Sequence, residues 1–362
     1  MKRIFALVAV VLLLGTTGAF AESSLTVMTR NLYLGADLSP VLAAQTPEAF
    51  FATVQSAAEQ IAASNFPERA VALAAEIAEK QPHLVGLQEV YDFTFNGSNG
   101  PPPYRDVLAD LMNALSAKGA NYRVAAVVRN ADLQIPLAGN IVGVLDRDVI
   151  LARGDVATSV VPRSLSGCRS SLDGCNYQVA ASAATPGGVI TIERGFVAVD
   201  AAINGSPVRF VNTHLEERYP DPTNPVSPII QSMQAYELIS ILSALPKHRN
   251  AMIIVAGDIN SSPQDMIISE GTYTIVPPYQ QLAYGGYIDT WDLRPGKPAG
   301  FTCCQAADIL NLDSILSERI DVIFTDRMPS GKVKVNVMGN DESDRTPSGL
   351  WPSDHAGVVA RI

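Results

Sequence analysis

Positive charge is scarce in this sequence. Its 362 residues include 26 Lys and Arg against 36 Asp and Glu. Two of the basic residues, Lys2 and Arg3, belong to an N-terminal segment that we expect to be removed. The net charge of the remaining chain is then 24 − 36 = −12. This balance disfavours a general nucleic-acid coat protein, whose affinity comes mostly from neutralising phosphates. It leaves room for an enzyme that meets phosphate through a bound metal ion.

Long hydrophobic runs are absent after residue 21. Before it, two basic residues lead into an apolar run over residues 4–14, and the segment ends in the letters AFA. This pattern predicts a signal peptide over residues 1–21, cleaved between Ala21 and Glu22, because the run is shorter than the ~20 residues of a membrane anchor. We therefore expect a secreted or periplasmic protein with no stable membrane span. No linker or repeat divides residues 22–362, which we expect to form one domain and a monomer.

Cysteine is rare as well, with four residues in the whole chain. Cys168 and Cys175 bracket the polar loop "CRSSLDGC", and in an oxidising compartment we expect them to form a disulfide. Cys303 and Cys304 are adjacent, and the sequence does not assign their state. Neither pair has the C-x-x-C spacing of a zinc site, and histidines are too few nearby to complete one.

The remaining pattern alternates strands with helices. Helical periodicity covers residues 47–80, with a break at "SNFPER", and recurs over 104–119 and 228–244. Short apolar strands occur throughout, and Asn204-Gly205 between two of them predicts a β-hairpin. Residues 93–105 and 153–190 are rich in Gly, Ser, Pro and Asn, and we expect them to be long surface loops. The whole predicts an α/β domain built on mixed sheets.

Polar and acidic residues stand repeatedly where apolar strands end. They are Asn31 after "LTVMTR", Glu89 after "LVGLQ", His214 after "VRFVNT", Asp258 and Asn260 after "MIIVAG", Asp321 within "RIDVIF", and Asp354 and His355 before the last strand. Each has an ordinary alternative as a turn former, a helix cap or a core histidine. Asp321 is harder to explain in this way, because a buried carboxylate needs a partner. Since strand ends gather on one rim of a sheet, we expect these residues to converge on a single cleft.

In this order the motifs resemble those of the endonuclease/exonuclease/phosphatase superfamily, the DNase I-like phosphohydrolases. The matching stretches are "TRNLY", "LVGLQEV", "FVNTHLE", "VAGDINSSP", "RIDVIF" and "SDHAGV", and they extend over nearly all of the chain after the signal peptide. The fold that the resemblance implies is an α/β four-layer sandwich. In it, two mostly antiparallel mixed β-sheets pack face to face with helices on the outside.

The resemblance also implies roles for the motif residues. Asn31, Glu89 and Asp354 would bind Mg²⁺, with Mn²⁺ or Ca²⁺ as alternatives. Asp321 would accept the imidazole N–H of His355, and Asp258 would position or deprotonate the attacking water. Asn260 would hold a phosphoryl oxygen, and His214 would donate hydrogen bonds to the phosphate in the transition state. Hydrolysis would then proceed by in-line attack of water on phosphorus.

The substrate is less clearly indicated than the reaction. We expect a phosphodiesterase of nuclease type acting on nucleic acid, with Arg30, Tyr33, Tyr104 and Arg105 as residues that could line its cleft. The alternative is a sphingomyelinase-like or inositol-phosphate-type esterase acting on phospholipid head groups. That alternative requires an exposed apolar hairpin, for which residues 272–291 are the candidate, although a packed connection into the strand at "IDTW" is the preferred interpretation of this segment. A binding protein that kept the fold without catalysis is a third hypothesis.

Overall fold

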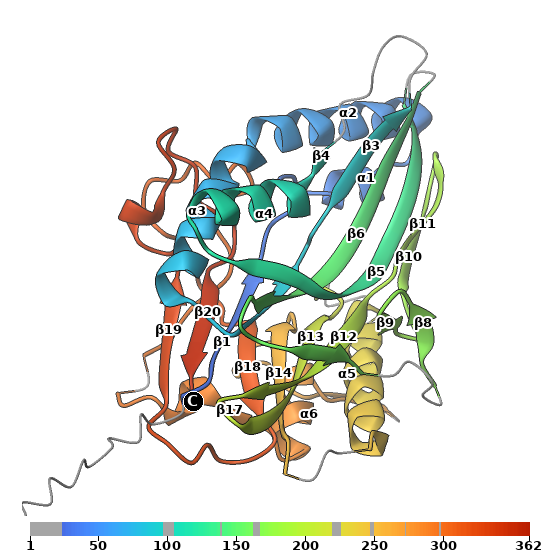
Figure 1. Ribbon diagram of the computed structural model, residues 1–362. Helices are drawn as coiled ribbons and strands as arrows, with labels where there is room; N and C mark the ends of the chain where they lie inside the picture. Colours follow the sequence, from blue (N-terminus) through green and yellow to red (C-terminus); the bar gives the residue numbers. More distant parts are fainter. Residues whose placement is uncertain are drawn as a thin grey trace, which may run out of the picture.

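The structure is a computed structural model that describes residues 24–96, 105–137, 140–161, 167–218, 226–246, 250–271, 273–296 and 298–362. The predicted signal peptide therefore lies outside the described residues. Two large β-sheets pack face to face, and helices cover their outer surfaces (Figure 1). Within the described residues, no helix is long and apolar enough to cross a membrane.

The first sheet has eight strands in the order β19-β20-β1-β2-β6-β3-β4, with β5 paired to β6. Only β1 and β2 run parallel, and the other pairs are antiparallel. The strands are β1 (Thr26–Asn31), β2 (Leu84–Gln88), β3 (Asp92–Asn96), β4 (Arg105–Asp106), β5 (Tyr122–Leu137), β6 (Asn140–Arg153), β19 (Lys334–Met338) and β20 (Gly357–Arg361).

The second sheet also has eight strands, in the order β17-β18-β14-β13-β12-β9-β8, with β7 paired to β12. Its one parallel pair is β13 with β14. The strands are β7 (Thr158–Val160), β8 (Arg169–Ser171), β9 (Gly174–Asn176), β12 (Gly195–Ile203), β13 (Ser206–His214), β14 (Met252–Asp258), β17 (Ile288–Asp289) and β18 (Asp321–Thr325). Between β12 and β13, Asn204 and Gly205 have φ of 51° and 80°. These values are typical of the tight turn that the sequence predicts.

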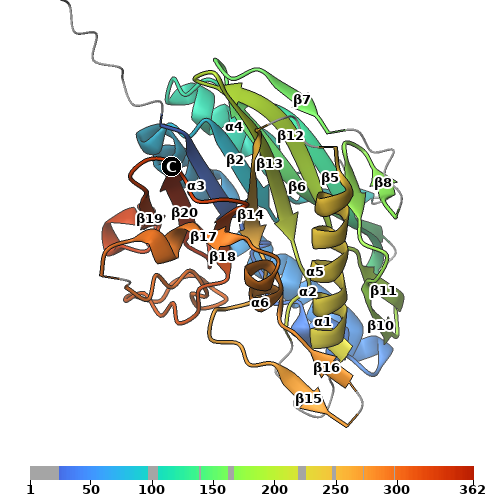
Figure 2. The ribbon, with the colours of Figure 1, turned by 90° about the horizontal axis from the view of Figure 1, so that it is seen from below.

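Three apolar layers hold the sandwich together. Between the sheets, side chains such as Val27, Ile150 and Phe210 are fully buried. α3 (Phe66–Lys80) and α4 (Val107–Ala117) pack on the outer face of the first sheet. α5 (Val226–Ala244) and α6 (Pro278–Tyr284) pack on the second, where Figure 2 shows α5 crossing the sheet. The predicted four-layer α/β sandwich is therefore confirmed.

The expectation of long loops over residues 153–190 is wrong. This segment contains five short strands, β7 to β9 and the two-stranded sheet of β10 (Ala181–Thr185) and β11 (Gly188–Ile192). In the 93–105 segment, residues 93–96 belong to β3 and Arg105 begins β4, while residues 97–104, with the candidate cleft residue Tyr104, lie outside the described residues. Backbone pairing with β12, with β6 or within a hairpin fixes these strands. Composition alone did not reveal them, because Gly, Ser and Asn are depleted from strands on average.

The smaller elements border one side of the sandwich. α1 (Ser39–Ala43) and α2 (Pro47–Ala63) pack with β11 in a separate apolar cluster. A further hairpin is formed by β15 (Ile268–Glu270) and β16 (Tyr273–Ile275). Two short 3₁₀ helices, η1 (Thr290–Leu293) and η2 (Glu342–Asp344), complete the elements of the described chain. Cys168 and Cys175 form the predicted disulfide, and Cys303 and Cys304 form a second one.

A buried amide ties the two sheets below the rim. The side chain of Asn212, on β13, donates to the carbonyls of Leu87 and Val149 at 2.9 and 3.1 Å, and accepts from the Gln88 amide at 2.6 Å. Gly86 makes room for it, since a Cβ there would lie 2.6 Å from the Asn212 Oδ1. Asn212, two residues before His214 in the stretch "FVNTHLE", is therefore structural.

Candidate active site

Strand direction brings the predicted site residues to one rim. β1 and β2 end side by side, with Asn31 opposite Gln88 and Glu89 next in the chain. β13 and β14 also end together, with His214 opposite Asp258. β18 and β20 run antiparallel to these neighbours, so they begin where the others end. For this reason Asp321, Asp354 and His355 precede or open their strands, whereas the other site residues follow theirs.

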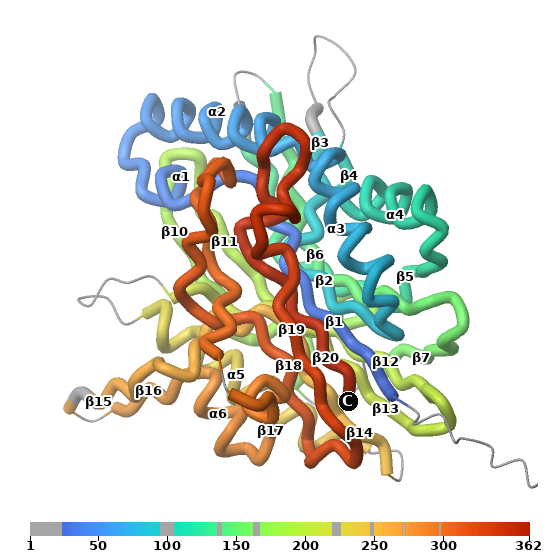
Figure 3. The backbone as a smooth tube through the Cα atoms, turned by 90° about the vertical axis from the view of Figure 1, so that its left-hand side faces the viewer, coloured from blue at the N-terminus to red at the C-terminus, as the bar shows by residue number. Residues whose placement is uncertain are grey.

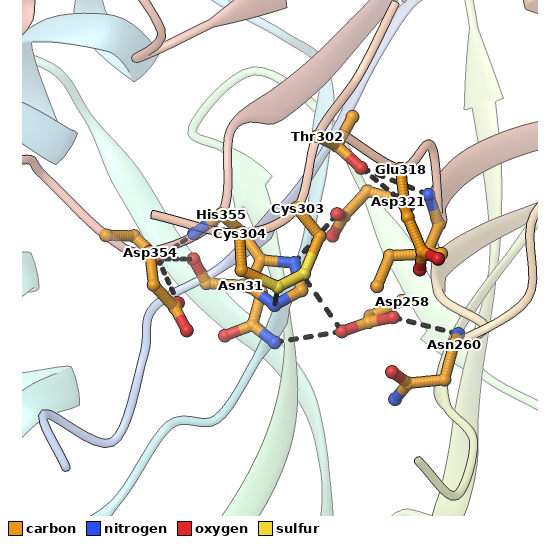
Figure 4. Close-up of a disulfide and its surroundings, with 12 residues drawn as sticks. Asn31, Asp258, Asn260, Thr302, Cys303, Cys304, Glu318, Asp321, Asp354 and His355 are labelled. Carbon is orange, nitrogen blue, oxygen red and sulfur yellow. Dashed lines mark hydrogen bonds and ion pairs between the residues drawn. A yellow bond between two sulfur atoms is a disulfide. The ribbon is translucent and has the colours of Figure 1, made fainter. Parts of the chain in front are cut away.

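His355 and Asp321 form a buried dyad (Figure 4). The Nδ1 of His355 lies 2.9 Å from the Oδ2 of Asp321 and 3.7 Å from the Oδ2 of Asp258. Burial disfavours the charged imidazole, but the carboxylates of Asp321, Asp354 and Asp258 outweigh it and hold the pKa of His355 well above its usual range. The ring is therefore cationic at neutral pH, with Nδ1 donating to Asp321.

His214 is held in the opposite protonation state. Its Nδ1 lies 2.9 Å from Arg194 Nη1. Because a guanidinium can only donate, this ring nitrogen must accept, and the proton of the neutral ring lies on Nε2. Burial and the charges of Arg194 and His355 hold the pKa of His214 well below its usual range. His214 thus presents a neutral N–H donor, 3.6 Å from the Oδ2 of Asp258.

Asp258 lies between the two imidazoles. Its Oδ1 accepts from the backbone N–H of Asn260 at 2.9 Å, and its Oδ2 accepts from the Asn31 amide at 3.1 Å. Burial, with the charge of Asp321, raises the pKa of Asp258 to about 7 despite the nearby His355. Such a carboxylate suits a general base, because catalytic bases work best with a pKa near the operating pH.

Glu89 and Asp354 form the acidic part of the site that faces solvent. Both are partly exposed and line the same cavity. Glu89 accepts from the Asn31 amide at 3.0 Å and from the backbone N–H of Leu34 at 2.7 Å. Burial and the charge of Glu89 raise the pKa of Asp354 to about 6, although His355 opposes the shift. The hard oxygens of these two carboxylates fit a divalent cation such as Mg²⁺.

Both polar atoms of the Asn31 side chain already have hydrogen-bond partners in the protein. Its Oδ1 accepts from the backbone N–H of Tyr33 at 2.9 Å, and its amide nitrogen bridges Glu89 and Asp258. Asn31 therefore orients two carboxylates, and its direct contact with a metal ion stays a prediction. Asn260 similarly lies 3.2 Å from the Nε2 of His214 and donates to the Leu215 carbonyl at 3.0 Å. Its contact with a phosphoryl oxygen also stays a prediction.

Asp258, Asp321 and His355 form a second candidate cation site. Ligand atoms of Asp258, Asp321 and His355 all lie within 4.8 Å of one another. In this group, however, the His355 ring already donates to Asp321. The side that carries Glu89 and Asp354 is the better fit, because both carboxylates line the cavity and are partly exposed, whereas Asp258 and Asp321 are buried.

Two arginines support the rim from below, and sequence reasoning missed both roles. Arg30 was a candidate for contact with nucleic acid, but its side chain is fully buried, paired with Glu76 of α3, and donates to the His355 carbonyl. Arg69 is also fully buried and donates to the carbonyls of Leu32 and Pro352 at 2.7 and 3.1 Å. Both hold the backbone that carries the catalytic groups, and no local pattern marks such long-range partners.

Other residues of the site were also missed. Asp146 lies 3.5 Å from Arg194 and lines the cavity, and burial raises its pKa to about 6 although Arg194 opposes the shift. The sequence does mark Asp146 as an acidic residue inside an apolar strand, which is the pattern that identified Asp321. The disulfide of Cys303 and Cys304 also lines the cavity, with the Cys304 Sγ 3.9 Å from the His355 Nε2 (Figure 4). The spacing of the cysteines gave no sign of a histidine so close to them.

Comparison with known proteins agrees with this arrangement. The profile of the Endonuclease/Exonuclease/phosphatase family matches residues 54–355, which is more than half of the chain. The protein belongs to the endonuclease/exonuclease/phosphatase family. No curated protein sequence matches it.

Solved structures of family members share the fold. One from Leptotrichia buccalis is 18% identical, with a TM-score of 0.51, covering 93% of this chain and 99% of that one. One from Beutenbergia cavernae is 20% identical, with a TM-score of 0.51, covering 94% and 71%. A mannosyl-6-phosphatase from Bacteroides thetaiotaomicron is 15% identical, with a TM-score of 0.50, covering 93% and 99%. At these identities the neighbours establish the fold, and membership of the endonuclease/exonuclease/phosphatase family makes the chain a phosphoesterase-type hydrolase.

Proposed function

We propose that the protein is a secreted or periplasmic, Mg²⁺-dependent phosphodiesterase in which water attacks phosphorus in line. One observation carries this proposal. The Oδ2 of Asp258 lies 3.6 Å from the Nε2 of His214 and 3.7 Å from the Nδ1 of His355, so a carboxylate base stands between a neutral and a cationic imidazole. A base flanked by two proton donors suits attack on a phosphoryl group whose oxygens gain charge.

Each side chain then has a distinct task. Asp258 takes a proton from the attacking water at Oδ2, which Asn31 holds in place. His214 donates from Nε2 to a phosphoryl oxygen as charge builds there. His355, fixed by Asp321, places a second N–H donor at the cavity wall, and this one is cationic.

The metal would be held by Glu89 and Asp354, with Asn31 orienting Glu89. When bound there, Mg²⁺ would neutralise negative charge on the phosphate, and Mn²⁺ or Ca²⁺ could substitute because they also prefer oxygen ligands.

Export is supported by the chemistry of the cysteines. The described chain contains two disulfides, and disulfides persist mainly in secreted and periplasmic proteins. The N-terminal pattern of residues 1–21 points the same way. We also retain the expectation of a monomer, which size-exclusion chromatography with light scattering would test.

The organic part of the ester decides between nucleic acid and lipid. The nuclease hypothesis needs unpaired cations along the cleft, since polynucleotide affinity depends on neutralising phosphates. Among the described lining residues the arginines already have carboxylate partners: Arg105 with Asp110, Arg194 with Asp146, and Arg218 with Asp265 and Glu318. These pairs weaken the nuclease hypothesis, while the reaction itself is unaffected.

Hydrolysis of bis(p-nitrophenyl) phosphate tests the proposed function. We expect turnover by the protein from Glu22 onward with Mg²⁺, none with EDTA, and a loss of about 10²–10⁴-fold in kcat for Asp258→Asn and for His355→Ala, the range for a general acid or base. Glu59→Gln, an exposed change on α2, is the matched control and should retain full activity. Turnover that survives EDTA or Asp258→Asn would refute the mechanism, and cleavage of p-nitrophenyl phosphate alone would make the protein a monoesterase.

A further inference from the structure

The catalytic rim opens into a much larger space than a phosphate needs. One continuous cavity of about 850 Å³ is lined by the site residues other than Asn31 and Asp321, and it extends away from them between α1–α2 and the strands β5, β6 and β11. We call this extension the apolar arm. It is lined by aliphatic side chains that include Val41, Val54, Ile61, Leu133, Val142 and Ile190. Such a volume lies near the upper end of ligand sites, which span about 300–1,000 Å³.

The apolar arm starts directly beside the proposed metal ligands. The backbone N–H of Leu34 donates to the Oε2 of Glu89 at 2.7 Å, while Leu34 itself belongs to the cavity wall. Asp258, Asp354 and His355 lie at the catalytic end of the lining, and the aliphatic side chains of the arm are bordered by two further charged residues, Asp37 next to α1 and Arg105 on β4. A ligand that fills the whole cavity must therefore have an anionic end and an apolar end.

The rim carries further apolar side chains that face solvent. Met266 is 79% exposed, and it follows Asp265, the partner of the cavity residue Arg218. Leu312 is 72% exposed, in the segment after Cys303 and Cys304, which line the cavity. Figures 2 and 3 show α1, β10–β11 and β15–β16 on the same side of the molecule. Exposed aliphatic side chains around an apolar opening are typical of contact with a lipid surface.

We propose that the substrate is a phospholipid, whose acyl or alkyl chain occupies the apolar arm while its phosphodiester lies against Asp258, His214 and His355. The inference rests on the proposed function, since it names the substrate class of the same site. The binding energy comes from removing the alkyl chain of the substrate from water. Each buried methylene raises the affinity about fourfold. A polynucleotide has no group that would fill an aliphatic arm, and the paired arginines offer its backbone no free cation.

The test compares alkyl p-nitrophenyl phosphate diesters that share one leaving group and differ in chain length. Methyl, butyl and octyl esters are used below the concentrations at which they aggregate, with Mg²⁺. We expect kcat/KM to rise by roughly 50-fold from methyl to butyl, which is the effect of three buried methylenes, and further for octyl. Plasmid DNA and RNA are assayed beside them.

Matched variants locate the effect. Ala57 lies on α2 against the apolar arm, so Ala57→Trp should collapse the ratio of octyl to methyl activity toward one. Ile135→Asp, on β5, should lower the same ratio by placing a charge in the arm. Ala52→Trp, an exposed change on the same helix outside the cavity, should leave the ratio as in the wild type.

Failure of the inference differs from failure of the proposed function. Turnover of the methyl ester without any dependence on chain length would overturn the lipid substrate and leave the phosphodiesterase intact. Faster cleavage of DNA or RNA than of the octyl ester would also overturn it, in favour of a nuclease. If no ester is cleaved, the proposed function fails. Calorimetric titration with dodecylphosphocholine below its critical micelle concentration then tests whether the apolar arm binds an alkyl chain. Binding that Ala57→Trp abolishes supports the inference, and no binding overturns it.

Discussion

The buried ion pair between Arg30 and Glu76 should be the most sensitive point of the scaffold beneath the site. Arg30, on β1, donates from Nε and Nη2 to the two carboxylate oxygens of Glu76, each at 3.0 Å. The side chains are 0% and 6% exposed. Arg30 Nη1 also donates to the carbonyl of His355, so one guanidinium joins α3, β1 and the catalytic dyad.

Glu76→Gln keeps the shape of this contact and removes its charge. The guanidinium would then be buried without a counter-ion, which costs about 3–5 kcal/mol when a buried pair loses one partner. For a domain of this size we expect a fall in Tm of about 4–7 °C. We also expect a lower kcat in the folded variant, because the donor to the His355 carbonyl is no longer fixed.

Thermal unfolding followed by circular dichroism, without reductant, measures the effect. Glu79→Gln is the control, since Glu79 lies on the same helix with its side chain 65% exposed beside Lys80. A surface pair of this kind is worth about 0–1 kcal/mol. Equal Tm values for the two variants would refute the reasoning.

A double variant separates stability from catalysis. Arg30→Met with Glu76→Leu replaces the pair by apolar side chains of similar size, and such replacements are often neutral or stabilising. We expect Tm to recover, while kcat stays low because the His355 carbonyl still lacks its donor. Recovery of both would mean that the pair does not position His355.

Three further predictions concern the rim. In the metal-free protein, NMR of the imidazoles at pH 7 should find His214 neutral and His355 protonated. Because the pKa of His214 is lowered in the folded state, its contribution to the free energy of unfolding falls as pH drops below about 6.5. Because the pKa of His355 is raised, its contribution is fully present below about pH 6.5 and is lost as pH rises through the raised pKa. His214→Gln should flatten the acidic limb of unfolding free energy against pH, and His355→Gln the alkaline limb; unchanged limbs would contradict these protonation states. Asp321→Asn should lower kcat by about 10²–10⁴-fold and move the alkaline loss of activity to lower pH, and an unshifted profile would remove Asp321 from its role. After reduction by dithiothreitol, Cd²⁺ should inhibit the wild type, because the ligand atoms of Cys303, Cys304 and His355 lie within 4.8 Å of one another. The oxidised protein and the Cys303→Ser, Cys304→Ser double variant should resist Cd²⁺, and inhibition of either would place the Cd²⁺ site elsewhere.

Local patterns in the sequence were enough to predict an α/β domain with mixed sheets and most of the rim, and the family resemblance supplied the four layers. Alternating apolar residues and the Asn204-Gly205 turn identify β12 and β13 because both signals arise from neighbouring residues. Polar residues at strand ends, such as Glu89 and Asp258, stand out because a strand interior would not tolerate them without a partner. The strands within residues 153–190 were missed, since they are fixed by pairing with distant segments and have no strong preference of their own.

The sequence by itself determined which kinds of side chain stand at the strand ends, and through them the family and the reaction. Only the tertiary structure decided how each is tuned. Arg30 and His355 are 325 residues apart, and Arg194, directly before β12, reaches His214 to fix its tautomer. The apolar arm likewise exists only where α1–α2 faces β5, β6 and β11. Protonation and cavity shape depend on distances in space, and no local pattern along the chain records those distances.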